Sequence, residues 1–213
     1  MATIIERRSV LALRALAWLG LALGCQKAQP AEDFAPLELG GEIRLTASTG
    51  LPFALSSLRG KAVLLFFGYT ACPDVCPTTL SRLAQVHARL VEEGVADRLE
   101  IVFVSVDPER DTPARLAEYL GYFHLPTVGL TGTVAEVSEV ARRYGASFER
   151  VEAKSAGGYL MNHSTYLYLI DPLGRVRHLF RHEDGPERIA EGVERVLAED
   201  CCQPPADRKA QAP

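Results

Sequence analysis

The sequence predicts an α/β fold in which helices cover a sheet, with a β-hairpin at the start of the domain. Two continuous apolar runs, at residues 63–67 and 101–106, are typical of strands that are buried on both faces. Each run precedes a segment whose apolar residues recur at helical spacing. The chain has 213 residues, of which 47% are apolar and 23% charged, so it is long enough for one domain with a sizeable core.

The first half of the domain contains the hairpin, one strand and one helix. Between residues 37 and 58, short apolar runs alternate with Gly40-Gly41 and Thr49-Gly50, which predicts the N-terminal β-hairpin. The first buried strand follows at 63–67. After Pro77, a helix of about four turns is predicted from apolar residues that share one face. These residues are Leu80, Leu83, Val86 and Leu90.

The second half continues the alternation. Thr112 followed by Pro113 is a favourable helix start after the second buried strand. The later elements are expected to be a strand at 128–130, a helix at 134–144 closed by Gly145, a mobile loop at 146–160, strands at 165–170 and 176–180 around a turn at 171–174, and a helix marked by Ile189, Val193 and Val196. Strands that alternate with helices and end in a hairpin and a helix predict a thioredoxin-like α/β sandwich.

The first 25 residues have the pattern of an export signal. Arg7 and Arg8 precede an apolar stretch at 15–23, which is too short to span a bilayer. The following Gly24-Cys25 resembles the end of a bacterial lipobox. We therefore expect residues 1–25 to be a lipoprotein signal peptide and Cys25 to be acylated, with a plain signal peptide as the alternative.

The predicted domain boundaries follow from this leader and from composition. Residues 26–33 are expected to be a polar tether, residues 34–198 the folded domain and residues 199–213 a disordered tail. The protein is then exported and membrane-anchored, facing the periplasm or the outer side of the cytoplasmic membrane. The formal net charge is −4, and nothing in the sequence indicates a nucleic-acid-binding surface.

The strongest chemical signal is a pair of cysteines directly after the first buried strand, in the segment Gly68-Tyr69-Thr70-Ala71-Cys72-Pro73-Asp74-Val75-Cys76-Pro77. Two thiols this close can cycle between dithiol and disulfide, bind a soft metal ion or form a structural bridge. Pro77 suits the first position of a helix, so we expect Cys76 at its N-terminal edge and Cys72 on the preceding loop. Unpaired amides and the helix dipole favour the thiolate there.

His163 is the best candidate for a third ligand. It is predicted to lie at the start of a strand, at a junction that faces the cysteine loop in a thioredoxin-type topology and normally carries a cis-proline. A histidine there favours metal binding over disulfide exchange, and two thiolates with a third donor suit copper(I) or zinc. The other histidines have no comparable setting and are expected on the surface or in packing: His87, His124, His178 and His182.

Three segments of the chain resemble the Sco/SenC family of copper chaperones for cytochrome c oxidase. They are residues 68–77, residues 105–113 (Ser-Val-Asp-Pro-Glu-Arg-Asp-Thr-Pro), and His163-Ser164 followed by the turn at 171–174. The resemblance covers roughly residues 34–198 and implies copper ligands at Cys72, Cys76 and His163. Family members often have Asp before this histidine, where the present chain has Asn162.

The resemblance also implies a function. A Sco-like protein would deliver copper to the copper A site of cytochrome c oxidase, or prepare that site, as a metallochaperone without substrate turnover. Its partner would be the oxidase subunit that carries this site or another periplasmic copper chaperone. The alternative is a thiol–disulfide reductase that acts on the cysteines of a copper-binding partner, with Cys72 and Cys76 as the redox-active pair. A peroxidase of peroxiredoxin type is disfavoured, because it needs a lone peroxidatic thiol with its own partners.

Four other features remain open between alternative roles. Asp74 either tunes the thiols or is a solvated loop carboxylate, and Asp107 either orients the site or caps the following loop. Met161 either passes copper onward or packs within its strand. The pair Cys201-Cys202 either binds copper or links chains, or is incidental to function.

Overall fold

The computed structural model describes residues 34–152 and 158–201. The predicted signal peptide with Cys25, the tether and Cys202 lie outside these residues. Within the described ranges, no helix combines the length and the apolar character that are needed to cross a membrane.

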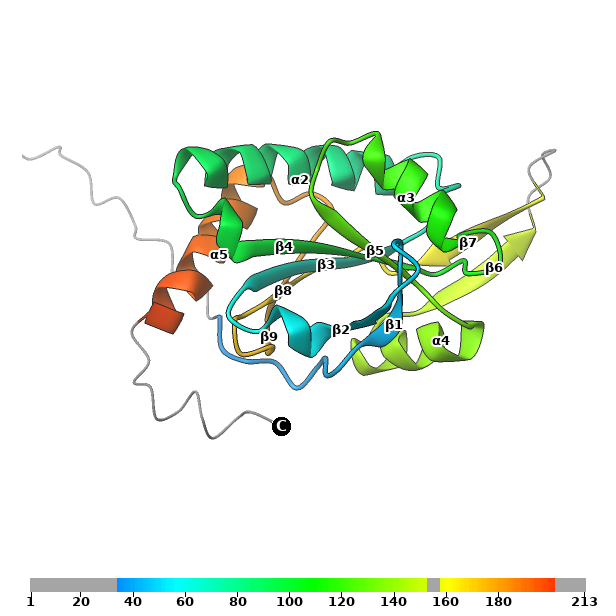
Figure 1. The fold of residues 1–213 in the computed structure, drawn as a ribbon, viewed down its shortest axis with the longest axis horizontal. Coiled ribbons are helices and arrows are strands. Elements are labelled where there is room, and N and C mark those ends of the chain that lie inside the picture. The colour runs from blue at the N-terminus through cyan, green and yellow to red at the C-terminus, as the bar shows by residue number, and fades with distance from the viewer. Residues whose placement is uncertain (1–33, 153–157, 202–213) are drawn as a thin grey trace, which may run out of the picture. The chain divides into compact units, whose positions relative to one another are not determined.

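A seven-stranded sheet forms the centre of the domain, with the strand order β2-β1-β5-β4-β3-β8-β9 (Figure 1). Its strands are β1 (Arg44–Ala47), β2 (Pro52–Ala54), β3 (Ala62–Gly68), β4 (Leu99–Ser105), β5 (Thr127–Thr131), β8 (Leu167–Ile170) and β9 (Val176–Phe180). β3, β4 and β5 are parallel, β1 and β2 form the predicted hairpin, and β8 runs antiparallel to β3. Every residue of β3 is buried, which confirms that this apolar run is a strand covered on both faces.

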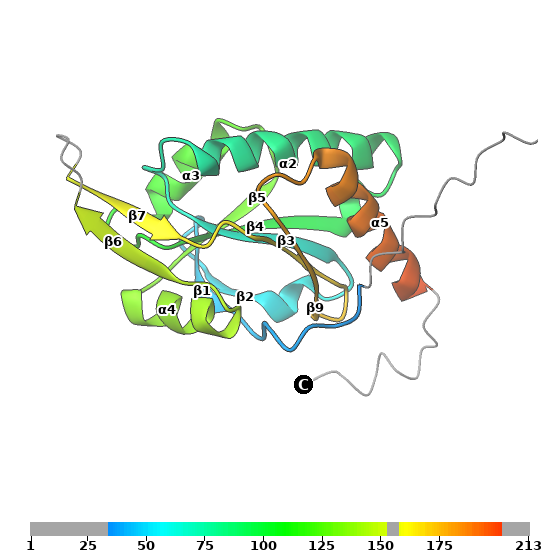
Figure 2. The same ribbon diagram turned by 180° about the vertical axis from the view of Figure 1, so that it is seen from behind.

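Helices cover both faces of this sheet. They are α2 (Val75–Glu92), α3 (Pro113–Gly121), α4 (Val134–Arg143) and α5 (Pro186–Cys201), with short 3₁₀ helices at Leu55–Leu58 and Ala96–Arg98. Figures 1 and 2 show α2 and α3 on one face and α4 on the other. Leu83, Leu116 and Val193 bury α2, α3 and α5 in one core, whereas Val137 buries α4 in the second. The predicted thioredoxin-like α/β sandwich is confirmed.

Local signals place the start of α3 and the end of α4 where they were expected. The Thr112 side chain caps α3 by accepting a hydrogen bond from the Arg115 amide at 3.3 Å, and Pro113 is the first helical residue. Thr133 caps α4 in a reciprocal capping box. Gly145 follows α4 with φ of 65°, a conformation that glycine adopts without steric cost.

The prediction of one loop at residues 146–160 is wrong. β6 (Phe148–Glu152) and β7 (Tyr159–His163) pair antiparallel as a separate two-stranded sheet, which Figure 1 shows beyond the end of the main sheet that lies away from α5. Exposed strands of this kind show no buried periodicity in the sequence. The boundary expected at residue 199 lies inside a helix, because α5 continues to Cys201.

Candidate metal centre

The two thiols lie where β3 leads into α2. Cys72 is half-buried in the connecting loop, and Cys76 is 1% exposed. α2 begins at Val75 rather than at Pro77, so Cys76 lies inside the first helical turn and not at its edge. The expected start was wrong because none of the first amides of a helix has an intrahelical acceptor, so proline fits the third position as well as the first. One of these amides, that of Cys76, points at Sγ of Cys72 over 3.5 Å.

Gly68, the last residue of β3, leaves space for the buried sulfur. A β-carbon at this position would lie 2.8 Å from Sγ of Cys76 and 2.9 Å from Cε2 of Phe103. Both distances are shorter than a normal van der Waals contact of about 3.5–4.0 Å. The absence of a side chain at the end of β3 is therefore part of how the site is built.

His163 brings the third donor, from the end of β7 rather than from the start of a following strand as predicted. Its Nε2 lies 3.8 Å from Sγ of Cys76, and the donor atoms of Cys72, Cys76 and His163 all lie within 4.8 Å of one another. Nδ1 lies 2.9 Å from the carbonyl oxygen of Ser164. Because a carbonyl only accepts, Nδ1 carries a proton and Nε2 is the nitrogen that is available to a metal ion.

The two thiols differ in acidity. The hydrogen bond from Cys76 is the main cause that lowers the pKa of Cys72 to about 3; the His163 ring and the Asp74 amide lower it further, and partial burial opposes them. The same hydrogen bond and burial raise the pKa of the Cys76 thiol. The pair therefore holds one thiolate and one thiol, which share a proton between adjacent sulfurs.

A buried carboxylate holds the start of the cysteine loop. Asp111 is fully buried and accepts hydrogen bonds from the amide and the hydroxyl of Thr70, at 3.0 and 2.6 Å, and from the Ser105 hydroxyl at 2.6 Å. Thr70 lies two residues before Cys72, so these bonds fix the loop that presents the more accessible of the two thiols, that of Cys72. The sequence carries no signal for this role other than the place of Asp111 in the segment 105–113.

The residues with open roles are placed as follows. Asp107 is 3% exposed and accepts a hydrogen bond from the Tyr159 hydroxyl at 2.8 Å, so its carboxylate reaches the strand that carries His163. Asp74 is exposed and does not cap α2 through its side chain. Met161 is half-buried and, two residues before His163, lies on the same face of the hairpin.

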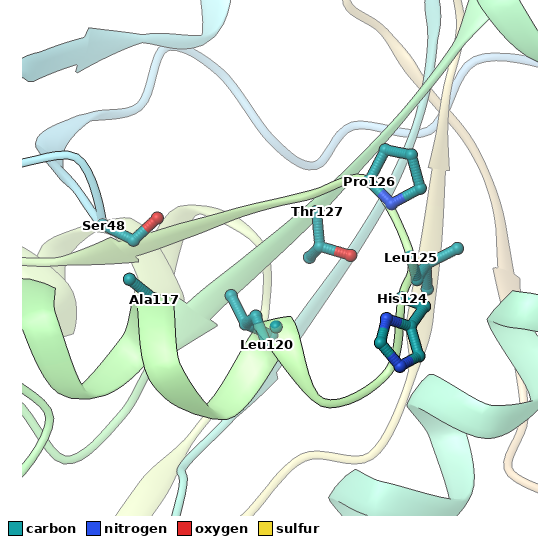
Figure 3. A pocket seen from close by; sticks show the side chains of 8 residues that line it. Ser48, Ala117, Leu120, His124, Leu125, Pro126 and Thr127 are labelled. Carbon is teal, nitrogen blue, oxygen red and sulfur yellow. The ribbon is translucent and has the colours of Figure 1, made fainter.

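The remaining histidines lie away from the thiols. His124 lines an open hollow of 470 Å³ at the beginning of β5 (Figure 3), whereas the cysteine loop follows the opposite end of the parallel strands. His178 packs against two phenylalanine rings, His182 lies 3.2 Å from an arginine, and His87 is half-buried on α2. Among the residues that the structure describes, Cys72, Cys76 and His163 form the only group of three or more histidine, cysteine, aspartate or glutamate side chains that is close enough to hold a metal ion.

The fold and this group of donors define a class of protein: a thioredoxin-like domain whose thiol pair has three intervening residues and an imidazole within reach. Comparison with known families makes the assignment specific. The chain belongs to the SCO1/SenC family, whose profile matches residues 32–198. The family resemblance of the sequence is thereby confirmed.

Known relatives match most of the domain. Mitochondrial protein SCO2 of Saccharomyces cerevisiae is 37% identical over 172 residues, which are 78% of this chain but only 57% of that protein. The structure of Bradyrhizobium japonicum ScoI with copper bound is 40% identical with a TM-score of 0.67, covering 74% of this chain and 99% of that one. BsSco, a member of the Sco family of cytochrome c oxidase assembly proteins in which a disulfide switch was identified, is 26% identical with a TM-score of 0.62, covering 80% and 99%.

Proposed function

We propose that this protein binds copper as cargo through Cys72, Cys76 and His163 and delivers it to a partner protein. The observation that carries the proposal is the arrangement of two sulfurs and one imidazole nitrogen within 4.8 Å of one another. Two thiolates and an imidazole suit copper(I), whereas structural zinc sites normally need four ligands. The likeness to B. japonicum ScoI, a structure that contains copper, supports the same choice of metal.

Loading and release follow from the state of the donors. Cys72 already is a thiolate, and Cys76 loses its proton when the metal binds. A hollow of 380 Å³ adjoins His163 and is lined by Phe148, Glu149 and Asn162 among others. This hollow and the half-buried Cys72 leave a path for donors of a partner. Copper can then pass by ligand exchange through shared thiolates, without release into water.

A copper titration tests the ligand set. We expect the reduced chain to bind one copper(I) per molecule in competition with a chromophoric chelator. Cys72→Ser and Cys76→Ser should abolish tight binding, and His163→Ala should weaken it. His124→Ala is the matched control, because this histidine lies at the other end of the sheet, and it should bind like the unchanged protein. Equal stoichiometry and affinity in all four variants would overturn the ligand assignment.

We infer that the recipient is the subunit of cytochrome c oxidase that carries the copper A site, or another periplasmic copper chaperone. The family resemblance supports this recipient, as does the description of BsSco as one of the oxidase assembly proteins. Deletion of the gene should lower oxidase activity, and added copper should partly restore it. Normal oxidase assembly in the deletion strain under copper limitation, with no related protein present, would contradict the delivery role.

The proposed location is the outer side of a membrane, with Cys25 as the lipid-bearing residue. Its support is the arginine pair, the apolar stretch and the lipobox-like end of the leader. Mass spectrometry of the mature N-terminus should find lipid on Cys25. A mature chain that begins elsewhere, or an unmodified Cys25, would favour a plain signal peptide.

A thiol–disulfide reductase is the second candidate, favoured by the unequal acidity of the two thiols. The Cys72 thiolate would attack a partner disulfide, and Cys76, after losing its proton, would then attack the mixed disulfide. The Cys72–Cys76 disulfide forms, while the partner disulfide gains two electrons and becomes two thiols with one proton from Cys76 and one from solvent. His163→Ala separates the two functions, because it should weaken copper binding and leave reduction of a model disulfide nearly unchanged.

Oxidation to the disulfide should block copper loading, since the same sulfurs serve both states.

A further inference from the structure

The position of His163 relative to the thiols is not set by the main sheet. β6 and β7 pair only with each other, so no ladder of backbone hydrogen bonds connects the strand that carries His163 to β3 or α2. Side chains alternate between the two faces of a strand, so those of Tyr159, Met161 and His163 lie on the same face of β7. Contacts of this face with the rest of the domain must therefore hold the imidazole near the sulfurs.

Tyr159 makes contacts both with the rest of the domain and within the hairpin. The guanidinium carbons of Arg110 and Arg150 each lie 3.8 Å from the centre of its ring. Because two guanidinium groups cannot occupy the same space, they cover opposite faces of the ring. The Tyr159 hydroxyl donates to Asp107 at 2.8 Å, and Arg110 donates from Nη1 to the Tyr159 carbonyl oxygen at 3.1 Å. We call Asp107, Arg110, Arg150 and Tyr159 the Tyr159 brace.

The brace continues to the imidazole through aromatic contacts. The guanidinium carbon of Arg110 also lies 5.8 Å from the centre of the Tyr69 ring. The Tyr69 ring in turn meets the His163 ring edge-to-face, with 5.8 Å between centroids and an interplanar angle of 88°. A continuous row of packed groups thus runs from Tyr159 through Arg110 and Tyr69 to His163.

The loop between β4 and α3 holds both halves of the site. Asp107 and Arg110 from this loop contact the hairpin, while Asp111 from the same loop binds Thr70 at the start of the cysteine loop. The two parts that carry the ligands are therefore tied to one short segment, although they do not pair with each other. Ion pairing of Arg150 with Glu109, at 3.8 Å, adds a further tie between loop and hairpin.

We propose that Tyr159 is a positioning residue, which holds His163 at coordination distance from the two sulfurs through the Tyr159 brace. This inference rests on the proposed copper site. Tyr159 touches no ligand itself and acts on copper only through the imidazole. Loss of the brace should therefore reduce copper(I) affinity by about 10-fold or more, the range found when groups that orient metal ligands are removed.

A double-mutant cycle with His163 tests the inference. In the full chain, Tyr159→Leu should weaken copper(I) binding and reduce the nitrogen hyperfine coupling in the EPR spectrum of the copper(II) form. In a His163→Ala background the same substitution should leave the affinity unchanged. Tyr159→Phe, which keeps the stacked ring, should retain most of the affinity. Tyr122→Leu is the matched control, because the Tyr122 side chain is exposed at the end of α3.

The outcomes separate this inference from the proposed function. If His163→Ala itself leaves affinity and spectrum unchanged, the copper site is wrong. If His163→Ala weakens binding but Tyr159→Leu does not, or if Tyr159→Leu weakens binding equally in both backgrounds, only the positioning role is overturned. Should Tyr159→Leu fail to fold, Arg150→Leu can replace it in the same cycle. This substitution removes the guanidinium group from one face of the Tyr159 ring, and the Arg150 side chain is 52% exposed.

Discussion

Gly68→Ala is the substitution that most directly tests how the thiol pair is packed. The added β-carbon would approach Sγ of Cys76 to 2.8 Å and Cε2 of Phe103 to 2.9 Å, about 1 Å inside normal contact. Overpacking of a core in this way costs about 1–3 kcal/mol. For a domain of this size each kcal/mol lowers Tm by about 2–4 °C, so we expect a decrease of about 2–12 °C.

The same substitution should also weaken copper binding. If the Cys76 sulfur moves to relieve the contact, metal–sulfur distances can no longer be kept within about 0.2 Å of their preferred values. We expect a loss of about tenfold in copper(I) affinity, which corresponds to about 1.4 kcal/mol. Differential scanning calorimetry and chelator competition measure the two effects.

A matched glycine provides the control. Gly121 ends α3, and no atom lies within 4 Å of the position of an added β-carbon. Gly121→Ala should leave copper affinity unchanged and keep or raise Tm, since alanine is favoured over glycine in a helix by about 0.5–1 kcal/mol. A Gly68→Ala protein with unchanged Tm and copper affinity would show that Cys76 is not packed against the end of β3.

Three further predictions concern the site and the scaffold. Because the pKa of Cys72 is lowered to about 3 while that of Cys76 is raised, iodoacetamide should modify Cys72 but not Cys76 in the folded protein, as peptide mapping can show. The rate at Cys72 should be nearly independent of pH from about pH 5 to 8, whereas in denaturant it should rise about tenfold per pH unit. A pH-dependent rate at Cys72 in the folded protein would contradict the assignment. Asp111→Ala leaves three donors without their buried acceptor, so urea unfolding should show a loss of about 3 kcal/mol, together with weaker copper binding. Arg177→Ala removes one of two arginines that pair with buried Asp171 and should lower the free energy of unfolding by about 2–3 kcal/mol. Copper affinity should stay unchanged, because this pair lies away from the thiols. A loss of copper affinity in this variant would refute the separation of scaffold and site.

Elements with a buried face were predictable from the sequence. The strand at β3 and the start of α3 could be placed because burial requires an apolar run and because Thr112-Pro113 has a defined capping geometry. The three donors that the structure brings together, Cys72, Cys76 and His163, could be identified as well, since the close thiol spacing and the setting of this histidine set them apart from the other cysteines and histidines.

The parts that could not be predicted lack such a signal. Four of the five residues of β6 are exposed, so this strand has no apolar alternation that would distinguish it from a loop. Asp111 appears in the sequence as one of several charges in the segment 105–113. Only the folded chain shows that its carboxylate is buried and meets three donors.

The separate hairpin has a consequence for how such a site can change. Sequence variation at residues 148–163 breaks no strand pair of the seven-stranded sheet, because β6 and β7 pair only with each other. The third donor, His163, is therefore carried by a hairpin outside the sheet, whereas the thiols lie between the end of β3 and the first turn of α2. A substitution at His163 could therefore exchange the imidazole for another donor without breaking a strand pair of the main sheet.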